Sequence, residues 1–172
     1  MDTNEKQQML ALLEQGRKAL LDALEGVDGE IVTRLPGPGQ WSILGCVEHM
    51  ATSEDYLFSQ IASAEPSTEP LLNPEREARM LARGSDRSRR IESPPEGHPT
   101  GRFPTLADAR DHFLSSRKRT VEFVQTCQQD LRAQATWHPI LGAANNYEML
   151  ISIAVHSLRH VKQIEQIKAG LA

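Results

Sequence analysis

Apolar side chains recur every three or four residues in four separate segments of this 172-residue chain. This is the period of an α-helix with one buried face, because a helical turn takes 3.6 residues. The predicted helices cover residues 5–27, 41–64, 106–131 and 147–168. Helices of this kind bury their apolar faces against one another, so the expected fold is all-α, a four-helix bundle. The length suits one domain over residues 1–172 and is too short for two of ordinary size.

The predicted helices begin at recognisable capping residues. Ser42 precedes the second helix, and Thr105, with Asp108 three residues later, forms a variant of the capping box before the third. Asn145 and Asn146 supply the cap of the last helix, which is expected to stop at Gly170.

A long connection over residues 65–104 separates the second and third helices and holds seven of the ten prolines. Such a loop is unusual in a compact domain unless it contains structure or function, and it permits bundle topologies other than simple up-and-down. A short helix is expected from Asn73-Pro74 to Arg83, since proline is well tolerated at the first helical position. The connection is rich in arginine, which would either meet an anionic ligand or form a solvated surface. These residues are Arg76, Arg79, Arg83, Arg87, Arg89 and Arg90.

Composition excludes several classes of protein. A formal net charge of −4 and a pI near 5.9 argue against a nucleic-acid binder, which would depend on Lys and Arg. The polar N-terminus is not followed by a signal-like apolar run, and no stretch approaches the roughly 20 apolar residues of a membrane span, so a cytoplasmic protein without membrane partners is expected. Cys46 and Cys127 fall inside predicted helices without CxxC spacing, which indicates buried thiols.

Histidines suggest a metal site. His156 and His160 are one turn apart on the inward face of the last helix, so one ion could bind both imidazoles. His49, at the margin of the apolar face of the second helix, is the candidate for a third ligand. Nearby small residues leave room for an ion, and Ser53 and Tyr56 are candidates for the wall of a substrate pocket. The alternative is that these histidines are buried core residues satisfied by neighbouring polar groups.

The region around this histidine pair lacks a general base in the expected place. Ser157, Leu158 and Arg159 separate the two histidines, so the glutamate of His-Glu-x-x-His metalloproteases is missing and that class is excluded. Glu48 and Glu54 are possible bases, but Glu48 is directed away from His49 on the helical wheel, and no catalytic residue is assigned. The other histidines are expected to be structural or exposed: His98, His112 and His138.

Two segments resemble the DinB superfamily, a group that includes YfiT-like proteins. The first is Trp41-Ser42-Ile43 followed by His49-Met50, and the second joins residues 138–142 to residues 156–164. The resemblance implies a four-helix bundle with a long connection between the second and third helices. It also implies that His49, His156 and His160 bind a divalent metal, typically nickel or zinc.

The function implied by this resemblance is less defined than the fold, because one fold hosts many activities. Relatives include transferases that use a low-molecular-weight thiol such as bacillithiol or mycothiol, and a metal-dependent isomerase. The leading hypothesis is therefore a metal-dependent thiol transferase acting on an electrophilic small molecule, since a coordinated thiol loses its proton. A metal-dependent hydrolase is the alternative within enzymes. A non-catalytic, stress-related binding module is the alternative outside them, and the resemblance also suggests a homodimer.

Overall fold

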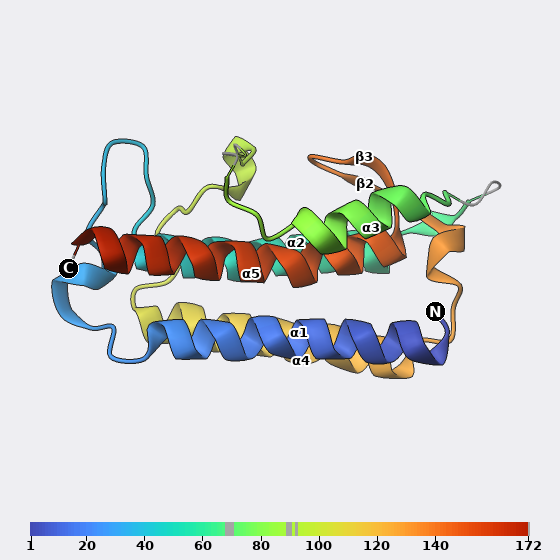
Figure 1. The fold of residues 1–172 in the computed structure, drawn as a ribbon, viewed down its shortest axis with the longest axis horizontal. Helices are drawn as coiled ribbons and strands as arrows, with labels where there is room; N and C mark the ends of the chain where they lie inside the picture. The colour runs from blue at the N-terminus through green and yellow to red at the C-terminus, as the bar shows by residue number, and fades with distance from the viewer. Residues whose placement is uncertain (68–70, 89–90, 92, 172) are drawn as a thin grey trace.

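Four long helices form the body of the protein in the computed structural model, which describes residues 1–67, 71–88, 91 and 93–171 (Figure 1). They are α1 (Thr3–Leu24), α2 (Ile43–Ala62), α4 (Leu106–Thr126) and α5 (Asn146–Leu171). A shorter helix, α3 (Pro74–Arg83), lies in the connection and packs against α5. The four-helix bundle expected from the sequence is confirmed, and the short helix has the predicted bounds.

The bundle does not have simple up-and-down topology. In Figure 1, α1 and α5 run in one direction, and α2 and α4 run in the other. The connection therefore has to return along the length of the bundle between the end of α2 and the start of α4. This is the arrangement that a long second connection permits.

The predicted N-terminal caps are present. The Ser42 hydroxyl accepts a hydrogen bond from the amide of Gly45 at 3.1 Å, and Thr105 accepts one from Asp108 at 3.1 Å. Asn145 accepts from the Glu148 amide at 2.9 Å, so this asparagine caps α5. Each cap satisfies an amide that has no partner within its helix.

The predicted C-terminal ends were less accurate. α1 ends at Leu24 instead of Val27, and α4 ends at Thr126 instead of Leu131, because the backbone becomes extended at the following residue. Leu131 is nevertheless buried in the core, which explains why the apolar spacing appeared to continue. Cys127 is thus a half-buried residue at the end of α4 rather than a buried helical thiol. α5 continues through Gly170.

A small antiparallel sheet was not predicted. Its strands are β1 (Glu65–Pro66), β2 (Gln134–His138) and β3 (Gly142–Asn145), in the order β1-β2-β3. Gly142, with φ of +73°, begins β3 after the hairpin turn. Strands of two to five residues are too short to show an alternating pattern that stands out from a loop. The sheet is a minor addition to a mainly helical fold.

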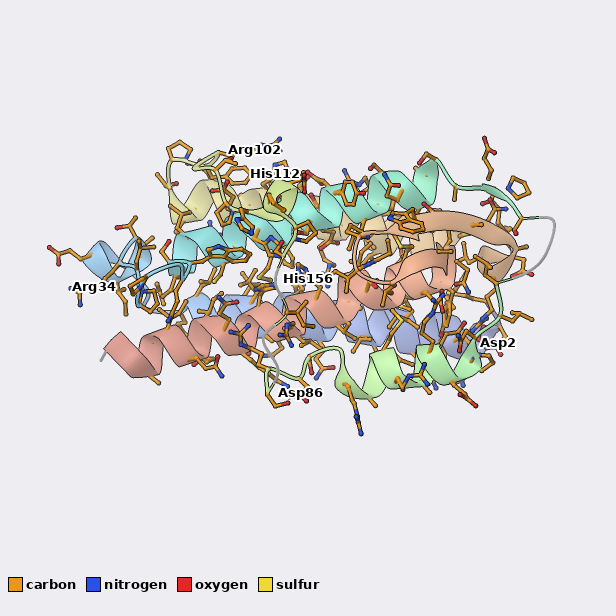
Figure 2. All side chains as sticks on the ribbon, turned by 90° about the horizontal axis from the view of Figure 1, so that it is seen from above. Asp2, Arg34, Asp86, Arg102, His112 and His156 are labelled. Atoms are coloured by element: carbon orange, nitrogen blue, oxygen red, sulfur yellow. The ribbon has the colours of Figure 1, made fainter. Side chains whose placement is uncertain are left out.

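The apolar core is divided into two clusters along the bundle. One contains Leu13, Leu57 and Leu150, and the other contains Leu20, Met50 and Ile164. Between them each long helix contributes small or polar buried residues: Gly16 on α1, Glu54 on α2, Arg117 and Thr120 on α4, and Ser157 and His160 on α5. Figure 2 shows His156 near the middle of α5. The candidate site therefore lies at a polar layer in the middle of the bundle.

Within the described residues, no helix is both long enough and apolar enough to span a lipid bilayer.

Candidate metal centre

Three histidines from two helices converge in the polar layer. Nε2 of His156 lies 3.0 Å from Nε2 of His49 on α2 and 3.0 Å from Nε2 of His160 on α5. One nitrogen of each ring lies within 4.8 Å of those of the other two. The structure thus brings together the three residues that the sequence singled out.

The hydrogen-bond partners of Nδ1 determine the tautomer of His49. Nδ1 lies 2.5 Å from the carbonyl oxygen of Gly97, and Ser53 Oγ is 3.3 Å from the same nitrogen. A carbonyl oxygen only accepts hydrogen bonds, so Nδ1 of His49 carries the proton. Its Nε2 is then an unprotonated nitrogen directed at His156.

His160 is held in the same tautomer by a different partner. Its Nδ1 lies 2.9 Å from Oε1 of Gln163, and the same oxygen accepts a hydrogen bond of 3.0 Å from Nη1 of Arg87. A guanidinium only donates, so the Gln163 atom facing both groups is the oxygen, and Nδ1 of His160 is the donor. Nε2 of His160 is also left unprotonated.

With these tautomers, the Nε2 atoms of His49 and His160 both need a hydrogen-bond donor at the centre of the cluster. Nε2 of His156 can donate to only one of its two neighbours, so at least one 3.0 Å contact joins two lone pairs. A cation removes this repulsion by accepting the lone pairs, and outer hydrogen bonds to the other ring nitrogens are typical of histidine ligands. The residues therefore fit a divalent metal with imidazole preference.

Burial keeps the three rings neutral. The pKa of His49 is lowered to about 4, chiefly by burial, and the pKa values of His156 and His160 are well below their ordinary value for the same reason. Neighbouring histidines contribute further lowering. Neutral imidazole is the form that binds metals, so the site is ready for an ion at neutral pH.

Trp41 covers the cluster from the segment before α2. Its ring centroid is 4.5 Å from that of His49, and it stacks on His160 with centroids 5.9 Å apart and planes 20° apart. His49 and His160 are buried, whereas His156 is only half-buried. His156 is therefore the most exposed of the three residues.

Glu48 orders the loop that supports His49. Its buried carboxylate accepts hydrogen bonds from the backbone amides of Thr100, Gly101 and Arg102, at 2.7 to 3.2 Å. The same loop carries the Gly97 carbonyl that fixes His49. Glu48 is directed away from His49, as the wheel indicated, and acts as a support rather than a free base.

The other carboxylates of α2 are also engaged. Glu54 is paired in the core with Arg117, at 2.9 Å between Oε2 and Nη2. Asp55 accepts from His112 at 2.6 Å and from Ser116 at 2.5 Å. Because the serine and the histidine bind separate oxygens of the carboxylate, this group is an ionic cluster and not a nucleophilic triad.

The remaining histidines are not part of the cluster. His98 is exposed, and His112 is half-buried in the ionic cluster with Asp55. His138 is buried in the β2–β3 hairpin, where Nδ1 accepts hydrogen bonds from the amides of Ile140 and Leu141. All three are structural or exposed, as expected.

Of the two predicted pocket residues, Ser53 lies beside His49, and Tyr56 is 45% exposed further along α2. No hydrogen bond links Tyr56 to the three histidines, and the substrate role of both residues remains a prediction.

The arginines of the connection have separate positions. Arg76 binds the buried carboxylate of Glu148, whereas Arg79 and Arg83 are exposed on α3. Arg87 reaches α5 and binds Gln163. The last two of the group, Arg89 and Arg90, lie outside the described residues.

Several supporting residues were missed from the sequence. Gln163 had a detectable signal, because it follows His160 by three residues and shares its helix face. Gly97 and Arg87 gave none, since loop residues far apart in sequence meet the histidines only through the fold.

Comparisons with known proteins agree with this architecture. YfiT from Bacillus subtilis, described as a probable metal-dependent hydrolase with an unusual four-helix bundle topology, superposes with a TM-score of 0.65 at 14% identity, covering 99% of this chain and 90% of YfiT. TT2238, described as a four-helix bundle protein, superposes with a TM-score of 0.51 at 22% identity, covering 94% and 98%. At these identities the likeness shows the fold. Among curated proteins the chain has no significant match.

The family assignment comes from the sequence profile. The model of the DinB superfamily matches residues 12–164, which include all four long helices in whole or in large part, and all three clustered histidines. The chain belongs to the DinB superfamily.

Proposed function

We propose that this protein is a metal-dependent enzyme that transfers a small thiol to an electrophilic substrate. The observation that supports a metal is the convergence of three neutral imidazoles, two of which, His49 and His160, already have a hydrogen-bond partner on Nδ1. Zinc and nickel both accept this donor set, and a bound ion would favour the thiolate of a coordinated thiol.

The surroundings of the cluster favour thiol transfer over hydrolysis. Every carboxylate on α2 is already bound, Glu48 by loop amides, Glu54 by Arg117 and Asp55 by His112. A metal-bound water is also activated by the ion, but a nearby base usually assists its attack, whereas a coordinated thiol becomes the nucleophile by losing its single proton to solvent. In the overall reaction the S–H bond breaks and a sulfur–carbon bond forms. The displaced group leaves with its electron pair, and the proton goes to solvent.

The chain's own residues have defined roles in this proposal. Gly97 and Gln163 orient the rings of His49 and His160 through Nδ1. Trp41 excludes water from one side of the cluster, and substrate approaches beside the half-buried His156.

A metal-dependent hydrolase is the second candidate. It is suggested by the description of YfiT, whose fold is similar, and by the fact that three protein ligands leave a position for water.

The first test is elemental analysis of untagged protein after dialysis against a weak chelator. The parent and a His112→Ala control should retain roughly one equivalent of zinc or nickel, and His49→Ala and His156→Ala should retain little. If no sample binds metal even after reloading, the histidines are core residues and the protein is a non-catalytic binding module.

The second test screens the metal-loaded protein for reaction. Conjugation of a chlorinated aromatic electrophile with members of a panel of cellular thiols, lost in His160→Ala, would support thiol transfer. Hydrolysis of model esters or amides without any conjugation would instead support the hydrolase.

A further inference from the structure

A small pocket lies next to the histidine cluster, and Gln163, which binds His160, forms part of its wall. It is open to solvent, has a volume of about 100 Å³, and is lined by Pro36, Gln40, Arg87, Gln163, Gln166 and Ile167. Gln163 thus belongs to both the pocket and the metal centre, and Gln40 directly precedes Trp41, whose ring stacks on His160. A group bound here is therefore one side chain away from the cluster.

Among the described residues, Arg87 is the only charged side chain in the lining of this pocket. It donates from Nε to Oε1 of Gln166 at 2.9 Å and from Nη1 to Oε1 of Gln163 at 3.0 Å. Both acceptors are neutral amides. Two of the five N–H donors of the guanidinium are thus used, and the others have no acceptor among the described residues.

The positive charge of Arg87 is not balanced by a carboxylate in the described part of the chain. The neighbouring Asp86 is turned away, with its oxygens bound to the amide and hydroxyl of Ser88 at 2.8 Å. Burial and the nearby charge of Arg159 lower the pKa of Arg87. A half-buried cation with neutral partners is a site that gains energy when an anion enters.

The segment that carries Arg87 is fixed to α5. Arg159 donates a hydrogen bond to the carbonyl of Asp86, and Lys162 donates one to Ser85 Oγ at 3.0 Å. Figure 2 shows Asp86 on the connection where it passes alongside α5. The guanidinium is therefore held in place before any ligand binds, which reduces the entropy lost on binding.

We propose that this pocket binds a carboxylate of the small-molecule substrate, with Arg87 as its principal contact. The planar guanidinium with adjacent free N–H groups matches a carboxylate in a bidentate pair, and the glutamine amides offer further donors. That Arg87 binds a carboxylate does not depend on the proposed function. Only the statement that this carboxylate belongs to the molecule reacting at the histidines rests on it. It restricts the substrate to thiols or electrophiles that carry an acidic arm.

The test follows the side-chain amide resonances of Gln40, Gln163 and Gln166 in full-length, ¹⁵N-labelled, metal-free protein during titration with succinate. Succinate should shift these resonances saturably, and the neutral isostere succinamide should not. Arg87→Gln should weaken succinate binding by about tenfold or more, because one charge-assisted pair is worth at least 1.4 kcal/mol. Arg83→Gln, which removes the same charge from an exposed position, should bind like the parent.

Arg87→Lys controls for a local folding defect in Arg87→Gln, since it keeps the charge and loses only the bidentate geometry. It should bind between the parent and Arg87→Gln. The proposal is wrong if succinate binds Arg87→Gln as well as the parent, if binding requires added zinc, or if phosphate binds and succinate does not. Loss of thiol transfer in the screen above would leave this metal-free result unchanged, so the two proposals fail separately.

Discussion

Nδ1 of His160 donates a hydrogen bond of 2.9 Å to Oε1 of Gln163, one turn further along α5. This contact fixes the ring so that Nε2 faces the other two histidines. We expect Gln163→Ala to weaken zinc affinity by about 10- to 100-fold, the usual effect of losing an outer partner of a histidine ligand. Competition with a chromogenic chelator measures it. Gln166→Ala, which loses only a contact with Arg87, should leave affinity unchanged, and equal effects of both variants would contradict this role.

Glu48 is expected to act through the loop at residues 97–102 and not as a base. Glu48→Gln places an NH₂ group against backbone amides, so the Gly97 carbonyl should lose its fixed position and metal affinity should fall. Chelator competition measures that fall, with Glu96→Gln, an exposed change directly before this loop, as the control. A displaced acidic limb in the pH–rate profile with unchanged metal affinity would instead make Glu48 a catalytic base.

The buried pair of Glu54 and Arg117 should be essential for stability. Arg117 also donates to the carbonyl of Leu13 at 2.7 Å, so it joins three helices. Glu54→Gln leaves a buried charge without its partner and should cost about 3–5 kcal/mol of unfolding free energy. Urea denaturation measures the change.

The exposed pair of Lys18 and Asp22 provides the comparison, since Asp22→Asn should cost under about 1 kcal/mol. Replacing both buried partners, as Glu54→Leu with Arg117→Met, should recover much of the loss because no charge remains unpaired. A loss in Glu54→Gln as small as that in Asp22→Asn would refute the expectation.

Gly16 allows α1 to approach α5 closely. A Cβ at this position would lie 2.3 Å from Oγ of Ser157, so Gly16→Ala should destabilise the protein by about 1–3 kcal/mol. Adding Ser157→Ala removes that oxygen and should restore part of the stability, a coupling that a double-mutant cycle detects. Gly170→Ala, with open space around it, should have little effect. If the stability changes of Gly16→Ala and Ser157→Ala simply add in the double mutant, the contact between these two positions does not cause the destabilisation.

His138 should make stability fall in mild acid. Burial, together with the charge of Arg76, lowers its pKa to about 4 in the folded protein. Between pH 6.5 and 4 the unfolded chain therefore binds more protons, so this contribution is complete above pH 6.5 and is lost as the pH falls.

His138→Asn keeps an acceptor for the Ile140 amide but does not titrate. In metal-free protein it should lose less stability than the parent between pH 7 and 5, by on the order of 1 kcal/mol. Urea denaturation at both pH values measures this. Equal losses of stability in the parent and in His138→Asn would show that His138 is as easily protonated in the folded protein as in the unfolded one.

The predictions from sequence were correct where a feature depends on residues close together in the chain. Ser42, Thr105 and Asn145 were correctly identified as caps because each binds an amide three residues away. The ends of α1 and α4 were misplaced because core packing and helical conformation produce the same apolar spacing. The β2–β3 hairpin was missed because its strands are too short to show a period.

The sequence alone determined the helical bundle and the identity of the three histidines. An i to i+4 pair on an apolar face and a third histidine among small residues are local patterns, and helix geometry turns them into positions. Only the tertiary structure decided what surrounds the rings. Gly97 and Arg87 lie in a proline-rich connection without periodicity, and their contacts with His49 and Gln163 span 48 and 76 residues of chain. Hydrogen bonds of that range follow from how the connection packs on the bundle, and no local spacing encodes them.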